Sequence, residues 1–134
     1  MTRFELSPRL AADSKPVARL GLCEMRLIDD SRWPWLLLVP QRPDITEIFE
    51  LTPLDQTMLT FETTLAASAL KKATGCTKIN VGALGNQVRQ LHVHVIARFE
   101  GDPGWPGPVW GHGVRKPYED DAQKALIEAV VGAL

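Results

Sequence analysis

The chain is poor in cysteine, in net charge and in long apolar runs, and each shortage excludes a class of protein. Its two cysteines, Cys23 and Cys76, form neither a metal-binding pair nor a disulfide framework, so we expect free thiols in a reducing compartment. The longest unbroken apolar stretch, Trp35 to Val39, is far too short to span a bilayer, and residues 1–8 lack the apolar core of a secretory signal. These absences predict a cytoplasmic protein.

The charge balance argues against two kinds of partner. Fifteen basic and sixteen acidic residues leave a formal net charge of −1, which provides no overall attraction to nucleic acid or to a membrane surface. With 134 residues, of which 45% are hydrophobic, the chain has the size and composition of one globular domain, residues 1–134. We therefore expect a single domain that binds neither nucleic acid nor membranes.

The periodicity of apolar residues predicts strands and helices in mixed order. Alternation over 22–29 and 77–81, and the apolar run 35–39, indicate strands, and the apolar run suits a strand covered on both faces. Thr52 and Pro53 provide the N-cap and first residue of a long helix, which Gly75 can end. Its recurring apolar residues are Leu54, Met58, Phe61, Leu65, Ala69 and Ala73. A second helix is expected over 119–134.

Two segments are expected to be irregular. Residues 1–19 combine prolines with scattered charges, which predicts an irregular or short helical arm on the surface. Residues 101–117 contain five glycines, four prolines and two tryptophans, a composition that predicts a long ordered flap fixed by Trp105 and Trp110. Strands arranged around one long helix and followed by a terminal helix indicate the α+β class.

The segment from Gln90 to Phe99 is the most informative, because it has two of the three histidines at alternate positions of a predicted strand. Side chains alternate across a strand, so His92 and His94 share one face with Gln90 and lie about 6 to 7 Å apart. The loop Gly82 to Gln87 joins this strand to the strand over 77–81, which predicts an antiparallel hairpin.

Three interpretations of the histidine pair are open. The two imidazoles can be polar side chains on a solvated strand face. They can be zinc ligands, although a closed site requires a third ligand and His112 is the only other histidine. They can also act in covalent catalysis, in which one neutral imidazole attacks phosphorus and the other assists the leaving group. The preceding glycine-bearing loop favours catalysis, since its N–H groups and amides can cradle a phosphate.

The sequence from Gln90 to Ile96 resembles the signature of the histidine triad (HIT) family, His-x-His-x-His followed by two apolar residues and preceded by a glycine-bearing loop. The resemblance extends through Asn80-Val81-Gly82, Leu37-Leu38-Val39-Pro40 and the long helix, and so covers residues 20 to 100. The flap motif from Gly104 to Trp110 is similar to that of a bacterial subgroup. The resemblance implies a five-stranded antiparallel sheet with one long and one C-terminal helix, a homodimer and a nucleotide substrate.

The resemblance also implies roles for individual residues. His92 would be the nucleophile that takes the nucleotidyl group, and His94 would contact the transferred phosphate and the departing atom. No metal and no cofactor would be required. The loop would cradle the α-phosphate, an asparagine would lie on the phosphate side, and an acid after the first strand would bind ribose hydroxyls. The implied substrate-binding residues are Asp29, Asp30, Asn80, Gly85, Asn86, Gln87 and Gln90.

Two residues depart from the family pattern. Gln90 occupies the first triad position, which in the family presents its backbone carbonyl to the Nδ1–H of the nucleophile. Any residue can fill that role, and the contact leaves Nε2 free to attack. Trp35 stands where many members carry a histidine before the central strand. We expect the chemistry to be retained but slowed or redirected.

The sequence therefore predicts an enzyme that cleaves a nucleoside phosphoramidate or a dinucleoside polyphosphate through a nucleotidyl-His92 intermediate. One alternative is a catalytically weak nucleotide-binding or sensor protein, which Gln90 motivates. A less favoured alternative is a metal-dependent hydrolase that uses His92, His94 and His112.

Overall fold

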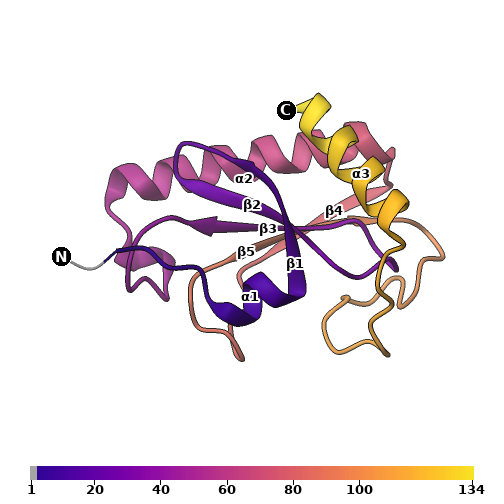
Figure 1. The fold of residues 1–134 in the computed structure, drawn as a ribbon, viewed down its shortest axis with the longest axis horizontal. Coiled ribbons are helices and arrows are strands. Elements are labelled where there is room, and N and C mark those ends of the chain that lie inside the picture. Colours follow the sequence, from indigo (N-terminus) through magenta and orange to yellow (C-terminus); the bar gives the residue numbers. More distant parts are fainter. Residues whose placement is uncertain (1–2) are drawn as a thin grey trace.

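The computed structural model describes residues 3–134, in which helices cover a five-stranded sheet (Figure 1). The strands are β1 (Ser14–Arg19), β2 (Cys23–Ile28), β3 (Trp35–Pro40), β4 (Lys78–Gly82) and β5 (Val93–Arg98). The helices are α1 (Pro8–Asp13), α2 (Pro53–Thr74) and α3 (Asp120–Ala133), with a short 3₁₀ helix, η1, at Ile48–Glu50. Neighbouring strands are antiparallel in the order β1-β2-β3-β5-β4, which confirms the expected fold.

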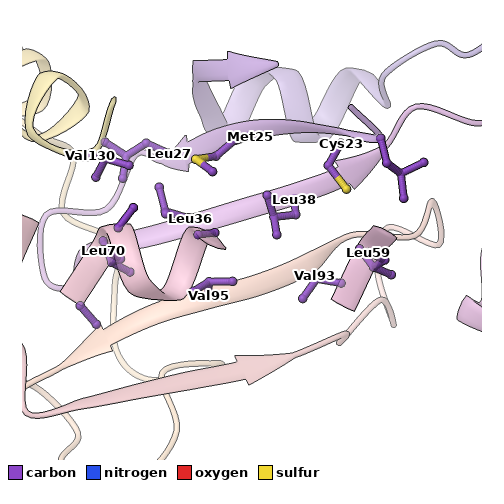
Figure 2. Packing of buried hydrophobic residues seen from close by; sticks show 14 of the residues in the cluster. Cys23, Met25, Leu27, Leu36, Leu38, Leu59, Leu70, Val93, Val95 and Val130 are labelled. Atoms are coloured by element: carbon purple, nitrogen blue, oxygen red, sulfur yellow. The ribbon is translucent and has the colours of Figure 1, made fainter. Parts of the chain in front are cut away.

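The strands present two faces, and α2 and α3 cover the first. Met25, Leu38 and Val95 from three neighbouring strands pack with Leu59 and Leu70 of α2 (Figure 2). Burial of apolar surface contributes about 25 cal/mol per Å², so this layer is a main source of stability. The second face lies under α1 and the flap, where residues of both pack against the sheet. It carries the predicted site.

Helix α2 begins and ends where its capping residues predict, but its buried face differs from the predicted one. The Thr52 hydroxyl accepts a hydrogen bond from the Asp55 N–H, and Gly75 takes the left-handed conformation with a φ of 68°. Leu54 and Phe61, expected in the buried stripe, are 69% and 67% exposed. The carboxylates of Asp55 and Glu62 also lie on the buried face, and a prediction from apolar spacing alone does not detect them. The buried residues of α2 are Asp55, Leu59, Glu62, Ala66, Ala69 and Leu70.

Glu62 accounts in part for the difference between the predicted and the observed buried face of α2. Its side chain is buried, and its two carboxylate oxygens accept hydrogen bonds from the N–H groups of Leu22 and Cys23, both at 2.8 Å. A buried carboxylate is tolerated only when such partners satisfy it. The interaction joins the middle of α2 to the first residues of β2, and so sets which side of the helix faces the sheet.

Residues 14–19 form an edge strand where the sequence predicted only a surface arm. The expected short helix is present as α1, but Ser14–Arg19 is β1, which pairs with β2 and shifts register between Pro16 and Ala18. Edge strands tolerate proline and charged residues, so the composition of this segment does not distinguish a strand from a loop. The arm prediction is therefore wrong for residues 14–19. Met1 and Thr2, which also belong to that prediction, lie outside the described residues.

The predicted hairpin and flap are both present. β4 and β5 pair along the whole of β4, which brings Gly82 opposite His94. Residues 101–117 contain turns and bends but no helix or strand. The flap is anchored by Arg98, whose guanidinium donates to both carboxylate oxygens of Asp102 at 2.8 Å and to the Gly107 carbonyl at 2.8 Å.

Replacing Glu62 by alanine leaves two buried N–H groups without partners, so we expect the free energy of unfolding to fall by about 2 to 4 kcal/mol. Urea denaturation followed by circular dichroism measures this change. Glu128→Ala, an exposed residue of α3, is the matched control and should change stability by less than about 0.5 kcal/mol. Equal midpoints for Glu62→Ala and wild type would contradict the role assigned to this carboxylate.

Candidate active site

His92 and His94 lie together at the beginning of β5. Their ring centroids are 4.9 Å apart in an edge-to-face arrangement, and each side chain is 6% exposed. Leu91 and Val93 alternate with them and pack into the core under α2. The expected alternation is confirmed, whereas the interpretation of the pair as a solvated strand face is wrong, because both imidazoles are buried.

The orientation of His92 is set by the backbone of Gln90. His92 Nδ1 lies 2.7 Å from the Gln90 carbonyl oxygen. A carbonyl only accepts, so Nδ1 carries the proton and donates it, and Nε2 retains its lone pair. This is the contact that the first triad position was expected to make, and a glutamine makes it with its backbone.

The Gln90 side chain is directed to the N-terminal segment. Its Oε1 accepts a hydrogen bond from the Ser7 N–H at 2.8 Å, and its Nε2 donates to the Glu5 carbonyl at 2.8 Å. Both hydrogen bonds lie just before α1 in the chain. The backbone carbonyl of Gln90 thus positions His92. Its side-chain amide holds the segment that leads into α1.

His94 is held at both ring nitrogens. Trp35 Nε1–H donates to His94 Nδ1 at 2.9 Å, and His94 Nε2 lies 3.2 Å from the Leu84 carbonyl oxygen, to which it must donate. Burial, together with the nearby His92, lowers the pKa of His94 from 6.5 to about 4. His94 is therefore a neutral imidazole at physiological pH, with its proton on Nε2.

The two histidines line a pocket of about 380 Å³ between α1, the glycine-bearing loop and the flap. One side of it is apolar, formed by Leu10, Leu37 and Val88. The other side carries the imidazoles and polar groups. A concave site with an apolar wall and a few convergent polar groups is the usual form of a small-molecule pocket.

The glycine-bearing loop closes on His92. A Cβ added to Gly85 would lie 3.1 Å from the Val88 carbonyl and 4.0 Å from the His92 ring, so a glycine allows the loop to approach the nucleophile. Asn86 and Gln87 line the pocket, and their role as a phosphate cradle stays a prediction. The Gln87 Oε1 accepts a hydrogen bond from Arg9 at 2.8 Å, which links the loop to α1.

Of the two predicted ribose acids, only Asp30 lines a cavity next to the histidine pocket, and both acids have protein partners. Asp30 forms an ion pair with Arg32 at 2.7 Å; burial opposes its ionisation, but the hydrogen bonds from Arg32 lower the pKa of Asp30 below its ordinary value. Asp29 accepts from the Tyr118 N–H at 2.9 Å. Asp30 lines a second cavity of about 420 Å³ that shares Trp35 as a wall with the histidine pocket.

Asn80 is also outside the walls of the histidine pocket. It lies on β4 opposite Ile96, and its Oδ1 accepts a hydrogen bond from Arg98 at 3.1 Å. The structure therefore brings Asn80 to the anchor of the flap. A phosphate role for its amide stays a prediction.

The sequence did not single out Arg9, Leu10 and Asp13 of α1, which line the pocket. These residues were missed because the segment was expected to be a surface arm, and no site residue was assigned to it. The available signal was the apolar set Phe4, Leu6 and Leu10 in an otherwise polar segment, since these residues pack together on the second face.

Trp110 was expected only to fix the flap, but it too lines the pocket. Its ring lies 5.3 Å from the His94 ring, centroid to centroid, in an edge-to-face arrangement. Within residues 3–134, its Nε1 is the one buried side-chain nitrogen or oxygen without a hydrogen-bond partner. Buried polar groups are usually hydrogen-bonded, so this N–H is an exception in the wall of the pocket.

His112 does not join the other two histidines. It lines the second cavity, and its ring packs against Trp33 with centroids 6.0 Å apart. Across residues 3–134 the structure has no cluster of three or more His, Cys, Asp or Glu side chains with the geometry to hold a metal ion. The grouping of His92, His94 and His112 required by the metal interpretation is thus not formed.

No helix within residues 3–134 is long and apolar enough to cross a membrane.

Comparisons with known proteins agree with this geometry. Residues 9–101 match the family model of the HIT domain. A histidine triad protein from Sinorhizobium meliloti is 62% identical, with a TM-score of 0.96 over 98% of this chain and 97% of that chain. A histidine triad protein from Bradyrhizobium japonicum is 41% identical, with a TM-score of 0.96 over 98% of each chain.

A hypothetical histidine triad nucleotide-binding protein from Sulfolobus tokodaii shares the fold at 18% identity, with a TM-score of 0.69 over 90% of this chain and 83% of that chain. No curated protein gives a significant match. Fold and site together define an α+β protein with paired histidines at the beginning of β5, an inner strand of an antiparallel sheet. The chain belongs to the HIT domain family, whose model covers more than half of it.

The low pKa of His94 makes stability depend on pH. The unfolded chain binds a proton at His94 near pH 6.5, whereas the folded chain binds it near pH 4. The stability that this group supports is therefore complete above its unfolded pKa and is lost as the pH falls toward 4. Between pH 7 and pH 4 we expect wild type to lose on the order of 3 kcal/mol more than His94→Gln. Chemical unfolding of both proteins at the two pH values measures the difference, and equal losses would contradict the assignment.

Proposed function

We propose that this chain is a nucleotide hydrolase or nucleotidyl transferase that cleaves a nucleoside phosphoramidate or a dinucleoside polyphosphate through a nucleotidyl-His92 intermediate. The observation that carries the proposal is the hydrogen bond from His92 Nδ1–H to the Gln90 carbonyl at 2.7 Å. It leaves the Nε2 lone pair unprotonated inside a pocket, which is what a nucleophilic imidazole requires.

The reaction proceeds in two displacements at one phosphorus. His92 Nε2 attacks the α-phosphorus, the bond to the leaving group breaks, and the leaving group takes the electron pair. The nucleotidyl-imidazole keeps its Nδ1 proton, and the Gln90 carbonyl stabilises the positive charge on that ring. Water then attacks phosphorus, the P–N bond breaks, and a proton from the water passes to solvent. His92 returns to its neutral form.

The walls of the pocket support a nucleotide substrate. Its apolar side can receive the base, between Leu10, Leu37 and Val88. The loop residues Gly85 and Asn86 can offer N–H groups to the phosphate beside His92. The ribose would then extend toward the second cavity, where Asp30 lies, in line with the predicted role of an acid after β2.

His92→Ala should remove turnover and leave nucleotide binding close to wild type, because the variant loses the nucleophile and keeps the walls of the pocket. Adenosine phosphoramidate and diadenosine polyphosphates are supplied in the presence of a chelator, and release of AMP is followed. Intact mass spectrometry detects the nucleotidyl adduct. Glu128→Ala, at an exposed position of α3 that lines neither cavity, is the control and should retain both signals.

Other outcomes of this experiment identify the alternatives. Tight nucleotide binding without product or adduct would support a nucleotide-binding or sensor protein. Turnover that the chelator abolishes would support a metal-dependent hydrolase. Turnover and adduct that persist in His92→Ala would overturn the nucleophile assignment.

We also propose that two copies pair through β4 and the adjoining surface of α2. β4 is an edge strand of the sheet, so its outer side can pair with a second strand. Phe61 of α2, Val81 of β4 and Phe49 of η1 are 67%, 52% and 78% exposed. A groove of about 250 Å³ lies between α2 and β4. An edge strand beside exposed apolar side chains suits a two-fold symmetric interface.

Val81→Asp should shift the protein toward the monomer, because it places a charge opposite its own copy in the paired strands. Light scattering coupled to size-exclusion chromatography measures the mass over a range of concentrations. Val131→Asp, at a 45% exposed position of α3, is the control and should leave the mass unchanged. A wild-type protein that is monomeric at every concentration would contradict the dimer.

A further inference from the structure

Trp35 presents to His94 a group that donates a hydrogen bond and cannot accept one. Its Nε1–H lies 2.9 Å from His94 Nδ1. An indole N–H has no lone pair with which to accept a hydrogen bond, so Nδ1 must present its own lone pair. The single proton of the neutral imidazole then belongs on Nε2, where the Leu84 carbonyl accepts it at 3.2 Å. Both contacts require the same tautomer.

The charged form of His94 has no partner in this arrangement. An imidazolium would direct its Nδ1–H at the Trp35 N–H, donor against donor. Neither hydrogen bond of His94 goes to a carboxylate. The titratable groups that share its pocket are His92, with ring centroids 4.9 Å apart, and the ion pair of Arg9 with Asp13 at 3.7 Å. Burial further lowers the pKa of His94.

A second tryptophan prevents the ring from rotating into another arrangement. Trp110 packs edge-to-face on His94. In the sheet, His94 lies opposite Gly82 of β4. A Cβ at Gly82 would lie 2.9 Å from the Trp110 ring, closer than real contacts allow, so this position requires glycine for Trp110 to be seated. The imidazole of His94 is thus confined by two indoles from different segments of the chain.

We propose that Trp35 is a positioning residue that holds His94 as a neutral Nε2–H donor, and that this state restricts the site to substrates whose leaving group departs as an anion. The restriction on substrates rests on the proposed function. The tautomer of His94 is a property of the folded protein alone and does not depend on turnover.

The restriction follows from what a neutral imidazole can supply. The His94 Nε2–H, which the Leu84 carbonyl accepts at 3.2 Å, can share that hydrogen bond with a departing oxygen, but the neutral ring has no spare proton to transfer. In a dinucleoside polyphosphate the P–O bond breaks and the electron pair leaves on a phosphate oxygen, which is stable as an anion and needs only the hydrogen bond. In a phosphoramidate the departing nitrogen must gain a proton, which an imidazolium could give and neutral His94 cannot. The site is therefore matched to phosphoric anhydrides.

The tautomer is tested by ¹⁵N NMR of histidine-labelled protein at pH 6, with the His94 signals identified by their loss in His94→Gln. We expect wild type to show protonated Nε2 and unprotonated Nδ1, and Trp35→Phe to lose this single state. Trp105→Phe is the matched control, because the Trp105 ring lies over Arg98 and not on His94; its His94 signals should equal those of wild type. A protonated Nδ1 in wild type, or an unchanged tautomer in Trp35→Phe, overturns the positioning role.

The leaving-group restriction is tested by the ratio of kcat/KM for diadenosine tetraphosphate to that for adenosine phosphoramidate. We expect wild type to favour the anhydride by about tenfold or more, and Trp35→His to reduce the ratio by about tenfold or more, because an imidazole at position 35 can accept and share a proton with His94. An unchanged ratio in Trp35→His overturns the restriction. Absence of turnover on both substrates in wild type would instead refute the proposed function, while the NMR result still decides the tautomer.

Discussion

The buried guanidinium of Arg98 is the interaction on which the placement of the flap depends. At 1% exposure it requires partners on every side, and it finds them in the Asp102 carboxylate, the Gly107 carbonyl and the Asn80 amide oxygen. These partners belong to β4 and to two points of the flap. Once they are fixed, the following residues are led across the second face of the sheet, where Val109 packs against Ile96. A segment without helix or strand is thereby fixed by side-chain contacts to the sheet.

The two faces of the sheet have different roles, since one packs into the main core and the other carries the pocket. The first is a continuous apolar layer under α2 and α3, interrupted by the Glu62 carboxylate that ties α2 to β2. The second is assembled from short pieces, namely α1, the glycine-bearing loop and the flap, and it leaves a pocket over the central strands. β5 contributes to both, with Val93 and Val95 on the first face and His94 on the second. The site is thus built on a strand whose opposite face is buried in the core.

The sequence predicted the local periodic features and missed those that depend on distant partners. The strands β2 to β5, the caps of α2, and the alternation of His92 with Val93 follow from neighbours along the chain. The prediction of the buried face of α2 was wrong because the hydrogen-bond partners of Glu62 lie about forty positions away in the chain. The burial of Arg98 could not be predicted for the same reason, since its partner Gly107 becomes a neighbour only after the flap folds back. β1 was missed because an edge strand has few sequence constraints.

The four tryptophans of the chain lie where β3 begins and in the flap that packs beside it, at positions 33, 35, 105 and 110. None belongs to the apolar layer under α2. Indole emission depends on the polarity around the ring, and the tryptophan emission of this protein originates from the side that holds the pocket. Trp35 and Trp110 both line that pocket. The unlabelled protein therefore carries its own optical probe of ligand occupancy, and the signal is free of background from the core.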